Sequence, residues 1–393
     1  MAFPTRPYCA ACGSAQASHT SLWIDNLTDA LSHRMPVHRI PFYSLLIGIT
    51  GAILNIFGQL SFFVGRGVRL VTLSDDPATA VSTRSRLLWE EAARRGMDIK
   101  QIMLFGSPTD AFRIRHSGRT EFFRSLPLSP DMRALSMDDK VLFKEAMAAA
   151  GLPVPKSFGV SSLAAARKAH AAIGVSCVKP RTGSNGRHTY PNIRTEQELD
   201  EAYANTRAIG PFVTVEEFIE GNLCRATCVG GKMIGFLESA YPTVIGDGTS
   251  TIAELIERTN SSRPEGVDEM VLDDVNDAFI KRRGYTRDSV LPEGTSLALT
   301  YRGGTGAGGS NREHGRAIHP SFIPIIEKAA NVTGLHIVGF DIIIPDPQKP
   351  ADSQKWGFIE SNSLPWIDLH ATPYYGDPID LSASVWDLWL ERA

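Results

Sequence analysis

Cysteine is scarce in this 393-residue sequence, which has only five, and neither sign of charge dominates. A sparse, odd-numbered set of cysteines is typical of a reducing compartment and argues against a disulfide framework. The formal net charge of −3 provides no overall positive field of the kind that attracts nucleic acid. No P-loop sequence G-x-x-x-x-G-K-[ST] is present, and no nucleophile elbow stands out. We therefore expect a cytoplasmic protein that is neither a P-loop NTPase nor a nucleic-acid-binding protein.

Two of the few cysteines, Cys9 and Cys12, form a lone C-x-x-C pair. A structural zinc site needs four ligands, and the nearby histidines His19, His33 and His38 do not lie at a recognised spacing from the pair. Ordinary terminal cysteines are therefore the favoured interpretation, and zinc binding or redox use is the alternative.

Long uncharged runs are also rare, with one exception at residues 41–65, PFYSLLIGITGAILNIFGQLSFFVG. This stretch is long enough to cross a bilayer, but polar residues and glycines recur through it. Arg39 and Arg66 flank its two ends, so charge gives no orientation. It begins too far into the chain for a cleaved signal peptide. We favour buried helices or a dimer face; an interfacial element that associates with a membrane, or a true span, is the alternative.

Most of the remaining chain contains helix and strand patterns in mixed order. Residues 82–96 and 136–155 have apolar residues at helical spacing and a glycine stop signal, so each predicts a helix. Residues 174–180 predict a short buried strand, and residues 224–239 predict a hairpin that turns at a Gly-Gly pair. Helices mixed with hairpins indicate an α+β protein built from lobes rather than a regular doubly wound sheet.

Two apolar segments near the end of the chain carry isolated polar residues. Asp341 is the one acid in HIVGFDIII (residues 336–344), where a buried carboxylate is costly unless it meets a cation or donors. Glu360 and Asn362 end the second segment, and side chains two residues apart on a strand point to the same face. If the two strands pair, the three side chains converge as hard oxygen ligands for Mg²⁺, or for Mn²⁺ in its place. A strand-end acid satisfied by backbone donors is the alternative.

A magnesium site implies phosphates, and residues 178–189, VKPRTGSNGRHT, have the composition of a phosphate cradle. Lys179 lies on the predicted strand, and Gly183 and Gly186 follow in the loop. Glycines allow backbone N–H groups to approach phosphate oxygens, while the lysine neutralises their charge. Lys140 could add a second contact. Taken alone, however, a glycine-rich hairpin is more often a simple turn.

The order and spacing of these motifs over about residues 80–380 resemble those of ATP-grasp carboxylate–amine ligases. The resemblance is to the branch that contains cyanophycin synthetase and the ligase domain of the fused glutathione synthetase. It is carried by CVKPRTGSNGRHT, VEEFIEGNLCRATCVGGKMI, VIGDGTSTIAELIERTN, GGTGAGGS, GFDIII and IESNSLPWIDLHATPYYGDP. It implies an ATP-grasp fold with the nucleotide between two α+β lobes. The implied divisions are an extension over 1–75, an N-terminal subdomain over 76–150, a small lid lobe over 151–218, and a metal- and substrate-binding lobe over 219–393.

The resemblance also implies a role for individual residues. ATP phosphates would be bound by two lysines and a closing loop, adenine would be framed at the hinge between lobes, and arginines would stabilise the transferring phosphate. The implied sets are Lys140, Lys179, Gly183, Ser184, Asn185, Gly186 and Arg187 for the phosphates; Glu216, Phe218 and Ile219 for adenine, with Glu217 a candidate for the ribose; Arg225 and Arg302 for catalysis; Asp341, Glu360 and Asn362 for the metal; and Asp368 and His370 for the substrate.

Three positions depart from the family pattern. Leu223 stands near the place of an acid that usually binds the ribose; here Glu217 or Asn222 could take over that contact, or it is absent. Ser239 stands where an arginine is common. Asp368 replaces an arginine in the segment after the metal asparagine, although His370 keeps its place. We hypothesise that Asp368 shifts selection toward a substrate with a positive group. A surface acid in a drifted loop is the alternative.

The resemblance implies an ATP-dependent ligase that joins an amino acid or short peptide to an amine through an acyl phosphate. ADP and phosphate would be released, and the glycine loops at 183–187 and 303–309 would exclude water as lids. A dimer or tetramer would be in keeping with the family. One alternative is a non-catalytic or membrane-associated nucleotide-binding protein on the same fold. A weaker one is a nicotinamide-dependent oxidoreductase, because GTGAGG at 304–309 fits G-x-G-x-x-G, although no amphipathic helix follows it directly.

Overall fold

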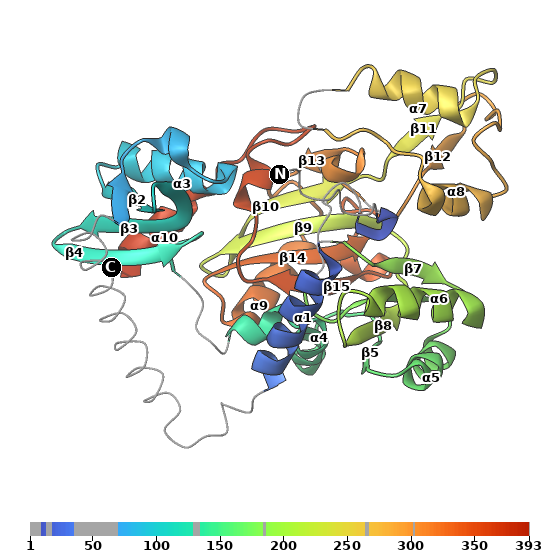
Figure 1. Ribbon diagram of the computed structural model, residues 1–393, viewed down its shortest axis with the longest axis horizontal. Helices are drawn as coiled ribbons and strands as arrows, with labels where there is room; N and C mark the ends of the chain where they lie inside the picture. Colours follow the sequence, from blue (N-terminus) through green and yellow to red (C-terminus); the bar gives the residue numbers. More distant parts are fainter. Residues whose placement is uncertain are drawn as a thin grey trace.

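The computed structural model describes the chain in seven segments, residues 9–12, 18–34, 70–128, 134–183, 186–263, 267–301 and 303–392 (Figure 1). The uncharged stretch at 41–65 lies outside the described residues, so its interpretation as a buried, dimer-forming or membrane element stays a prediction. Within the described segments, no helix has the length and apolar character needed to cross a membrane.

A five-stranded antiparallel sheet forms the centre of the protein, with the strand order β13-β10-β9-β14-β15 (Figure 1). Its strands are β9 (Asn222–Val229), β10 (Lys232–Ser239), β13 (Asn311–Glu313), β14 (Ile337–Ile344) and β15 (Gly357–Asn362). β9 and β10 form the predicted hairpin, and both glycines of its turn have a positive φ that other residues rarely adopt. β14 and β15 pair as predicted, so both expected pairings are confirmed.

The two faces of the central sheet differ in chemistry. Helices α4 (Lys140–Ala149) and α9 (Phe322–Thr333) lie on one face (Figure 1) and share a core with Phe340 and Ile342 of β14. Because successive side chains on a strand alternate between faces, Asp341 points to the opposite face. The charged groups predicted to bind the metal therefore lie on the face that the two helices leave uncovered.

A second lobe contains a four-stranded antiparallel sheet with the order β5-β8-β6-β7. Two helices share its core. Its elements are β5 (Ser157–Val160), α5 (Leu163–Ile173), β6 (Ser176–Pro180), β7 (Tyr190–Ile193), α6 (Glu196–Arg207) and β8 (Val213–Glu217). The strand predicted over 174–180 is confirmed as β6. The glycine-rich loop joins β6 to β7, so this lobe carries the predicted phosphate cradle.

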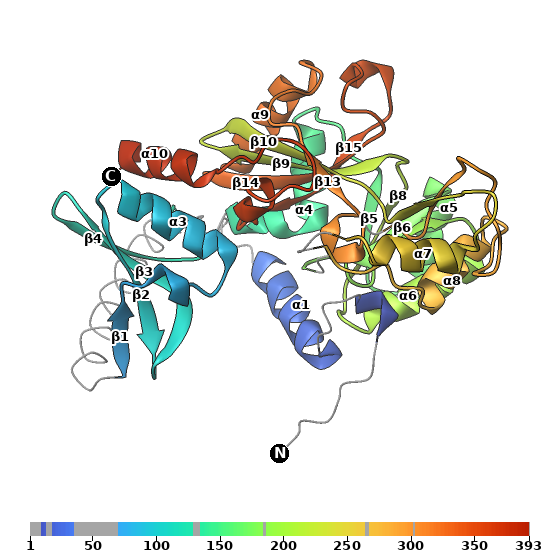
Figure 2. The ribbon, with the colours of Figure 1, turned by 90° about the horizontal axis from the view of Figure 1, so that it is seen from above.

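A third unit consists of the antiparallel sheet β1-β2-β3-β4 with helix α3 beside it. Figure 2 shows the last helix, α10, lying next to α3 over this sheet. The elements are β1 (Val71–Ser74), α3 (Thr83–Arg94), β2 (Asp98–Leu104), β3 (Ser107–His116), β4 (Arg119–Arg124) and α10 (Ser382–Arg392). Trp386 and Trp389 of α10 pack in one core with Trp89 and Phe112. The helix predicted over 82–96 is confirmed as α3.

The chain segment between β10 and β13 forms a small unit with its own hydrophobic core. It contains β11 (Thr243–Ile245), α7 (Ile252–Asn260), α8 (Asp274–Lys281) and β12 (Ser296–Ala298). Thr251 and Glu254 form a reciprocal capping box that fixes the start of α7. The remaining elements are helix α1 (His19–Arg34) and short 3-10 helices η1 (Ala10–Cys12), η3 (Pro77–Thr79), η4 (Ala134–Asp138), η5 (Thr305–Ala307), η6 (Ala351–Ser353) and η7 (Ile367–His370).

Substituting Trp386 tests the observation that the C-terminal helix completes the core of the third unit. Trp386 is fully buried, and its indole N–H donates to the Leu88 carbonyl at 2.9 Å. We expect Trp386→Ala to lower the free energy of unfolding by about 3–5 kcal/mol in chemical denaturation. Phe105→Ala is the matched control, because Phe105 is 77% exposed and its loss should cost less than about 0.5 kcal/mol. Equal effects would contradict the packing.

Candidate functional site

The predicted metal ligands lie on two paired strands. Asp341 on β14 lies directly opposite Glu360 on β15. The next residue of β14, Ile342, pairs with Phe358, so the register shifts between Asp341 and Ile342. The shift leaves Ile359 as an extra residue on β15, which forms a β-bulge. Because Phe358 pairs with Ile342 on the core face, regular alternation would place Glu360 on that face too. The bulge instead places Glu360 beside Asp341.

Asn362 is the third predicted ligand and lies two residues beyond Glu360 on β15, so it shares the same face. Its amide nitrogen is buried and has no hydrogen-bond partner among the described residues. A buried polar atom without a partner is costly and often marks the place of a ligand. The structure therefore brings all three predicted oxygen donors to one face of the sheet.

Arg225 on β9 lies next to this group and is paired with Asp341 in the sheet register. Its Nε and Nη2 atoms donate to the two Asp341 carboxylate oxygens at 2.6 and 3.1 Å, while its buried Nη1 has no partner among the described residues. Burial raises the pKa of Asp341 despite the positive charge of Arg225, and the adjacent Glu360 carboxylate adds to the rise. The two acids therefore repel each other, and a divalent cation between them would offset that repulsion.

Lys140 links Glu360, a predicted metal ligand, to the glycine-rich loop. It is the first residue of α4, and its Nζ lies 3.0 Å from Glu360 Oε2 and donates to the Gly183 carbonyl at 2.7 Å. Burial opposes ionisation of Glu360, but Lys140 outweighs it and lowers the pKa of that carboxyl. Lys140 thus favours the negatively charged form of Glu360 and holds the start of the loop.

Lys179 shares the buried Glu216 carboxylate with Lys144, a residue that was not predicted from the sequence. Glu216 Oε1 and Oε2 each lie 2.6 Å from a lysine, Lys179 Nζ and Lys144 Nζ respectively. Burial lowers the pKa of Lys144 to about 8, whereas for Lys179 the nearby carboxylates outweigh burial and raise its pKa. Lys144 could have been found from its spacing, because positions 140 and 144 lie on the same face of a helix.

The residues predicted to frame adenine point in different directions. Glu216 is only 3% exposed, and its carboxylate is held by Lys179 and by Lys144 of α4. Its neighbour Val215 points into the core of the lobe, so Glu216 lies on the opposite face of the sheet, toward α4. Glu217 points outward and pairs with Lys355 at 2.5 Å. The Phe218 ring packs edge-on against Tyr301, with 5.5 Å between ring centroids, and Ile219 is buried. Their roles toward a nucleotide stay predictions.

The glycine-rich loop is described only at its two ends. Gly183 and Gly186 both have a positive φ, at 59° and 73°, as expected for a loop that turns sharply. Arg187 is half-buried beside them. Ser184 and Asn185 lie outside the described residues, and so does the predicted catalytic residue Arg302. The phosphate-binding and catalytic roles of this group therefore stay predictions.

The two predicted substrate residues have different surroundings. His370 is fully buried, and its ring nitrogens lie 2.6 Å from Glu313 Oε2 and 2.7 Å from Thr227 Oγ1. Both polar atoms of the ring are thus already used, so a substrate role for His370 stays a prediction that requires these partners to change. Asp368 is only partly buried, and its Oδ1 atom is buried without a partner among the described residues. Burial raises the pKa of Asp368, while a hydrogen bond from its own backbone N–H and the charge of Arg84 oppose the rise.

The GTGAGG segment does not open into a helix. It forms the 3-10 turn η5 and leads into β13, which pairs antiparallel with β10. A dinucleotide-binding fingerprint needs a helix directly after the glycines, because the helix N-terminus binds the pyrophosphate. This geometry argues against the oxidoreductase alternative.

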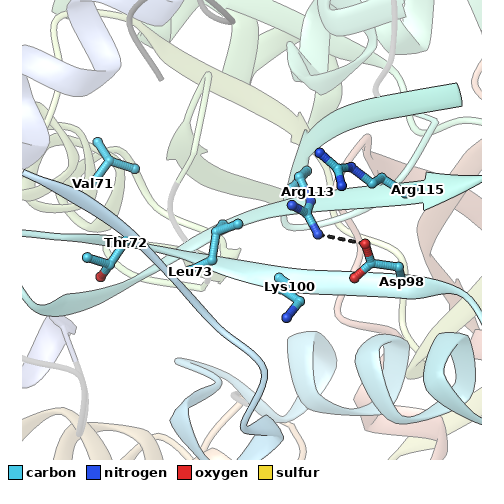
Figure 3. A pocket seen from close by; sticks show the side chains of 7 residues that line it. All are labelled: Val71, Thr72, Leu73, Asp98, Lys100, Arg113 and Arg115. Carbon is cyan, nitrogen blue, oxygen red and sulfur yellow. Dashed lines mark hydrogen bonds and ion pairs between the residues drawn. The ribbon is translucent and has the colours of Figure 1, made fainter. Parts of the chain in front are cut away.

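A separate cavity of about 570 Å³ lies in the third unit, on the sheet face at β1, β2 and β3. Figure 3 shows Arg113 paired with Asp98, with Lys100 and Arg115 beside them. None of the residues that line this cavity belongs to the predicted nucleotide or metal group. Its walls lie on the third unit, whereas that group lies on the central sheet and the second lobe.

No protein-family model matches the chain. Among curated proteins, cyanophycin synthetase from Trichormus variabilis is 32% identical over 258 residues, 64% of this chain and 29% of the relative. The glutathione biosynthesis bifunctional protein GshAB from Clostridium perfringens is 25% identical over 265 residues, 65% of this chain and 34% of the relative. The crystal structure of a bifunctional glutathione synthetase from Pasteurella multocida superposes with a TM-score of 0.55 at 22% identity, covering 79% of this chain and 44% of that one.

These similarities identify the protein as one with the α+β ATP-grasp fold, as the sequence motifs predicted. Within that class it is a homologue of the cyanophycin synthetases and of the bifunctional glutathione proteins. The chain spans about a third of the length of these curated relatives.

Removing Glu216 tests the buried pairing of Lys144 and Lys179. We expect Glu216→Ala to lower the free energy of unfolding by about 3–5 kcal/mol, because two buried ammonium groups lose their shared partner. The neighbouring Glu217→Ala is the matched control and should cost at most about 1 kcal/mol, because its partner Lys355 is exposed. Urea denaturation of both variants measures the difference. Costs of similar size would show that Glu216 does not hold the two lysines.

Proposed function

We propose that this chain is an ATP-dependent ligase that joins a small carboxylic acid, an amino acid or a short peptide, to an amine. The observation that carries the proposal is the face of the central sheet on which Asp341 and Glu360 lie side by side, each paired with a cation. The names of the homologues support it, since they are a synthetase and a bifunctional protein of glutathione biosynthesis.

Asp341, Glu360 and Asn362 are the proposed ligands of Mg²⁺, for which Mn²⁺ could substitute. Two adjacent carboxylates and a side-chain amide are hard oxygen donors. Burial raises the pKa of Asp341, and the neighbouring Glu360 carboxylate adds to the rise. Once bound, the metal would draw charge from the transferring phosphoryl group.

Lys140 and Lys179 are the proposed phosphate-binding cations. In the structure each is paired with a carboxylate, so the group is close to neutral overall, and a phosphate can replace a carboxylate as the partner of a lysine. Arg225 is the proposed stabiliser of the transferring group, because its Nη1 is a buried donor without a partner among the described residues. Arg302 would act with Arg225, as the family resemblance implies.

The proposed reaction has two steps. An oxygen of the substrate carboxylate attacks the γ-phosphorus of ATP, and the bond to the leaving ADP oxygen breaks, which gives an acyl phosphate. The amine then attacks the acyl carbon, the bond to phosphate breaks, and the amine nitrogen loses a proton. Water must be excluded between the steps, and we assign this duty to the glycine loops at 183–187 and 303–309.

The proposal predicts ADP release that requires an acid and an amine together. We expect Asp341→Asn and Glu360→Gln each to lower kcat/KM on the order of 100-fold, because each removes one charge from the metal group. The control is Asp346→Asn, since Asp346 lies after β14 and pairs with exposed Lys349. A coupled ADP assay with pooled amino acids, followed by mass spectrometry of the product, makes the measurement. ADP release without both substrates, or nucleotide binding without turnover, would refute the ligase and favour a non-catalytic protein.

We further propose that Asp368 contacts a positive group on one substrate. Its Oδ1 atom is buried and has no partner among the described residues, which leaves an acceptor available to a donor on a ligand. Arg84 is near enough to attract the carboxylate, but no ion pair joins the two within the described part of the chain. Burial of an acceptor of this kind is offset only when it meets a donor.

This assignment predicts a change in substrate preference. We expect Asp368→Arg and the isosteric Asp368→Asn to weaken use of a cationic substrate about tenfold or more, as expected for a lost charged hydrogen bond. The KM for ATP should stay unchanged, which distinguishes a lost contact from a damaged site. Competition between pairs of amino acids that differ in charge, read by mass spectrometry, measures the preference. An unchanged preference would show that Asp368 does not contact the substrate.

A further inference from the structure

Four potential metal ligands meet where the N-terminal segment touches the second lobe. Cys9 and Cys12 belong to the turn around η1, His19 begins helix α1, and His188 comes from the loop between β6 and β7. One ligand atom from each of the four residues lies within 4.8 Å of all the others. His19 is one of the nearby histidines noted beside the cysteine pair, whereas His188 lies 176 residues from Cys12.

The distances within this cluster agree with tetrahedral coordination. His188 Nε2 lies 3.6 Å from both Cys9 Sγ and Cys12 Sγ, and His19 Nε2 lies 3.4 Å from Cys12 Sγ. Zinc–sulfur and zinc–nitrogen bonds of about 2.3 and 2.05 Å at the tetrahedral angle place sulfur and nitrogen about 3.6 Å apart. A single ion would therefore reach these donors with little movement of the side chains.

The surroundings of His188 orient its ring toward the sulfurs. Nδ1 lies 2.6 Å from the Asn205 carbonyl, which only accepts hydrogen bonds, so Nδ1 carries the proton and Nε2 presents its lone pair to the cluster. The backbone is held as well, because the His188 N–H donates to the Ala11 carbonyl and Thr206 Oγ1 donates to the His188 carbonyl. His188 has a φ of 49°, which a residue other than glycine adopts only when its surroundings enforce it.

We propose that Cys9, Cys12, His19 and His188 form a structural zinc site. Two thiolates and two imidazoles are a donor set that favours Zn²⁺ over hard cations, and two thiolates neutralise the charge of the ion. Four protein ligands also leave no open position for a substrate, which is typical of a structural rather than a catalytic site. The site is separate from the proposed magnesium group, and its existence does not depend on the ligase activity.

The zinc site would fasten the N-terminal segment across both ends of the glycine-rich loop. His188 lies just after the loop, while at its start Thr182 Oγ1 donates to the Asn26 carbonyl of α1 at 3.3 Å. Asn26 Nδ2 also donates to the Ile209 carbonyl at 2.5 Å, so α1 contacts the second lobe at two places. The ion would supply a third, stronger connection between the N-terminal segment and the second lobe.

Metal analysis of the full-length chain, purified without chelators, tests the proposal. We expect about one zinc per chain, and a fall of about tenfold or more in Cys9→Ser/Cys12→Ser and in His188→Ala. Cys228→Ala is the control, because Cys228 lies in the central core and should leave the zinc content unchanged. Replacing zinc with Co²⁺ in the wild type should produce a thiolate-to-metal charge-transfer band and the visible spectrum of a tetrahedral ion.

Three results would overturn the proposal. In the first, the wild-type chain contains no zinc and gives no tetrahedral Co²⁺ spectrum. In the second, the double cysteine variant keeps the wild-type zinc content. In the third, His188→Ala gives the same Co²⁺ spectrum as the wild type. If the variants fail to fold, the wild-type zinc content and Co²⁺ spectrum decide the matter. All of these readouts are independent of ADP release, so failure of the ligase proposal leaves them interpretable.

Discussion

The compensation of buried charge between α4, the central sheet and the second lobe is the constraint on which the rest of the structure depends. Three carboxylates form ion pairs there. Glu360 pairs with Lys140, and Asp341 pairs with Arg225. Glu216 pairs with both Lys144 and Lys179. Isolated charges in such positions would be very costly, so each can persist only while its partner stays in place. Because Lys144 comes from α4 and Glu216 from β8, the same pairing also joins the second lobe to the helix that packs on the central sheet.

Local sequence patterns predicted the strands and the hairpin that carry this site. The strands around Asp341 and Glu360, the hairpin of β9 and β10, and the strand that carries Lys179 follow from hydrophobic patterns and glycine positions. The bulge at Ile359 could not be predicted, because it shows only in the register between two strands. Without it, Glu360 would face the core, and so the shared face of Asp341 and Glu360 depends on one unpaired residue.

Other features were missed because they join residues that are distant in sequence. His188 completes the cysteine cluster from the loop between β6 and β7, and no spacing rule connects it to Cys9. Glu313 and Thr227 hold both ring nitrogens of His370, a fact that only the packed structure contains. Motif order predicted which chemistry to expect, whereas the partners that orient each side chain are a property of the tertiary fold.

The position of α10 affects the order in which the molecule is completed during synthesis. The sheet β1–β4 emerges from the ribosome among the first structured parts, yet its core includes tryptophans that are translated nearly 300 residues after Leu88. Until those residues emerge, the part of this core that α10 covers stays open to water or to other chains, where a chaperone could shield it. Nascent chains that stall before residue 382 therefore expose the surface that the finished protein buries.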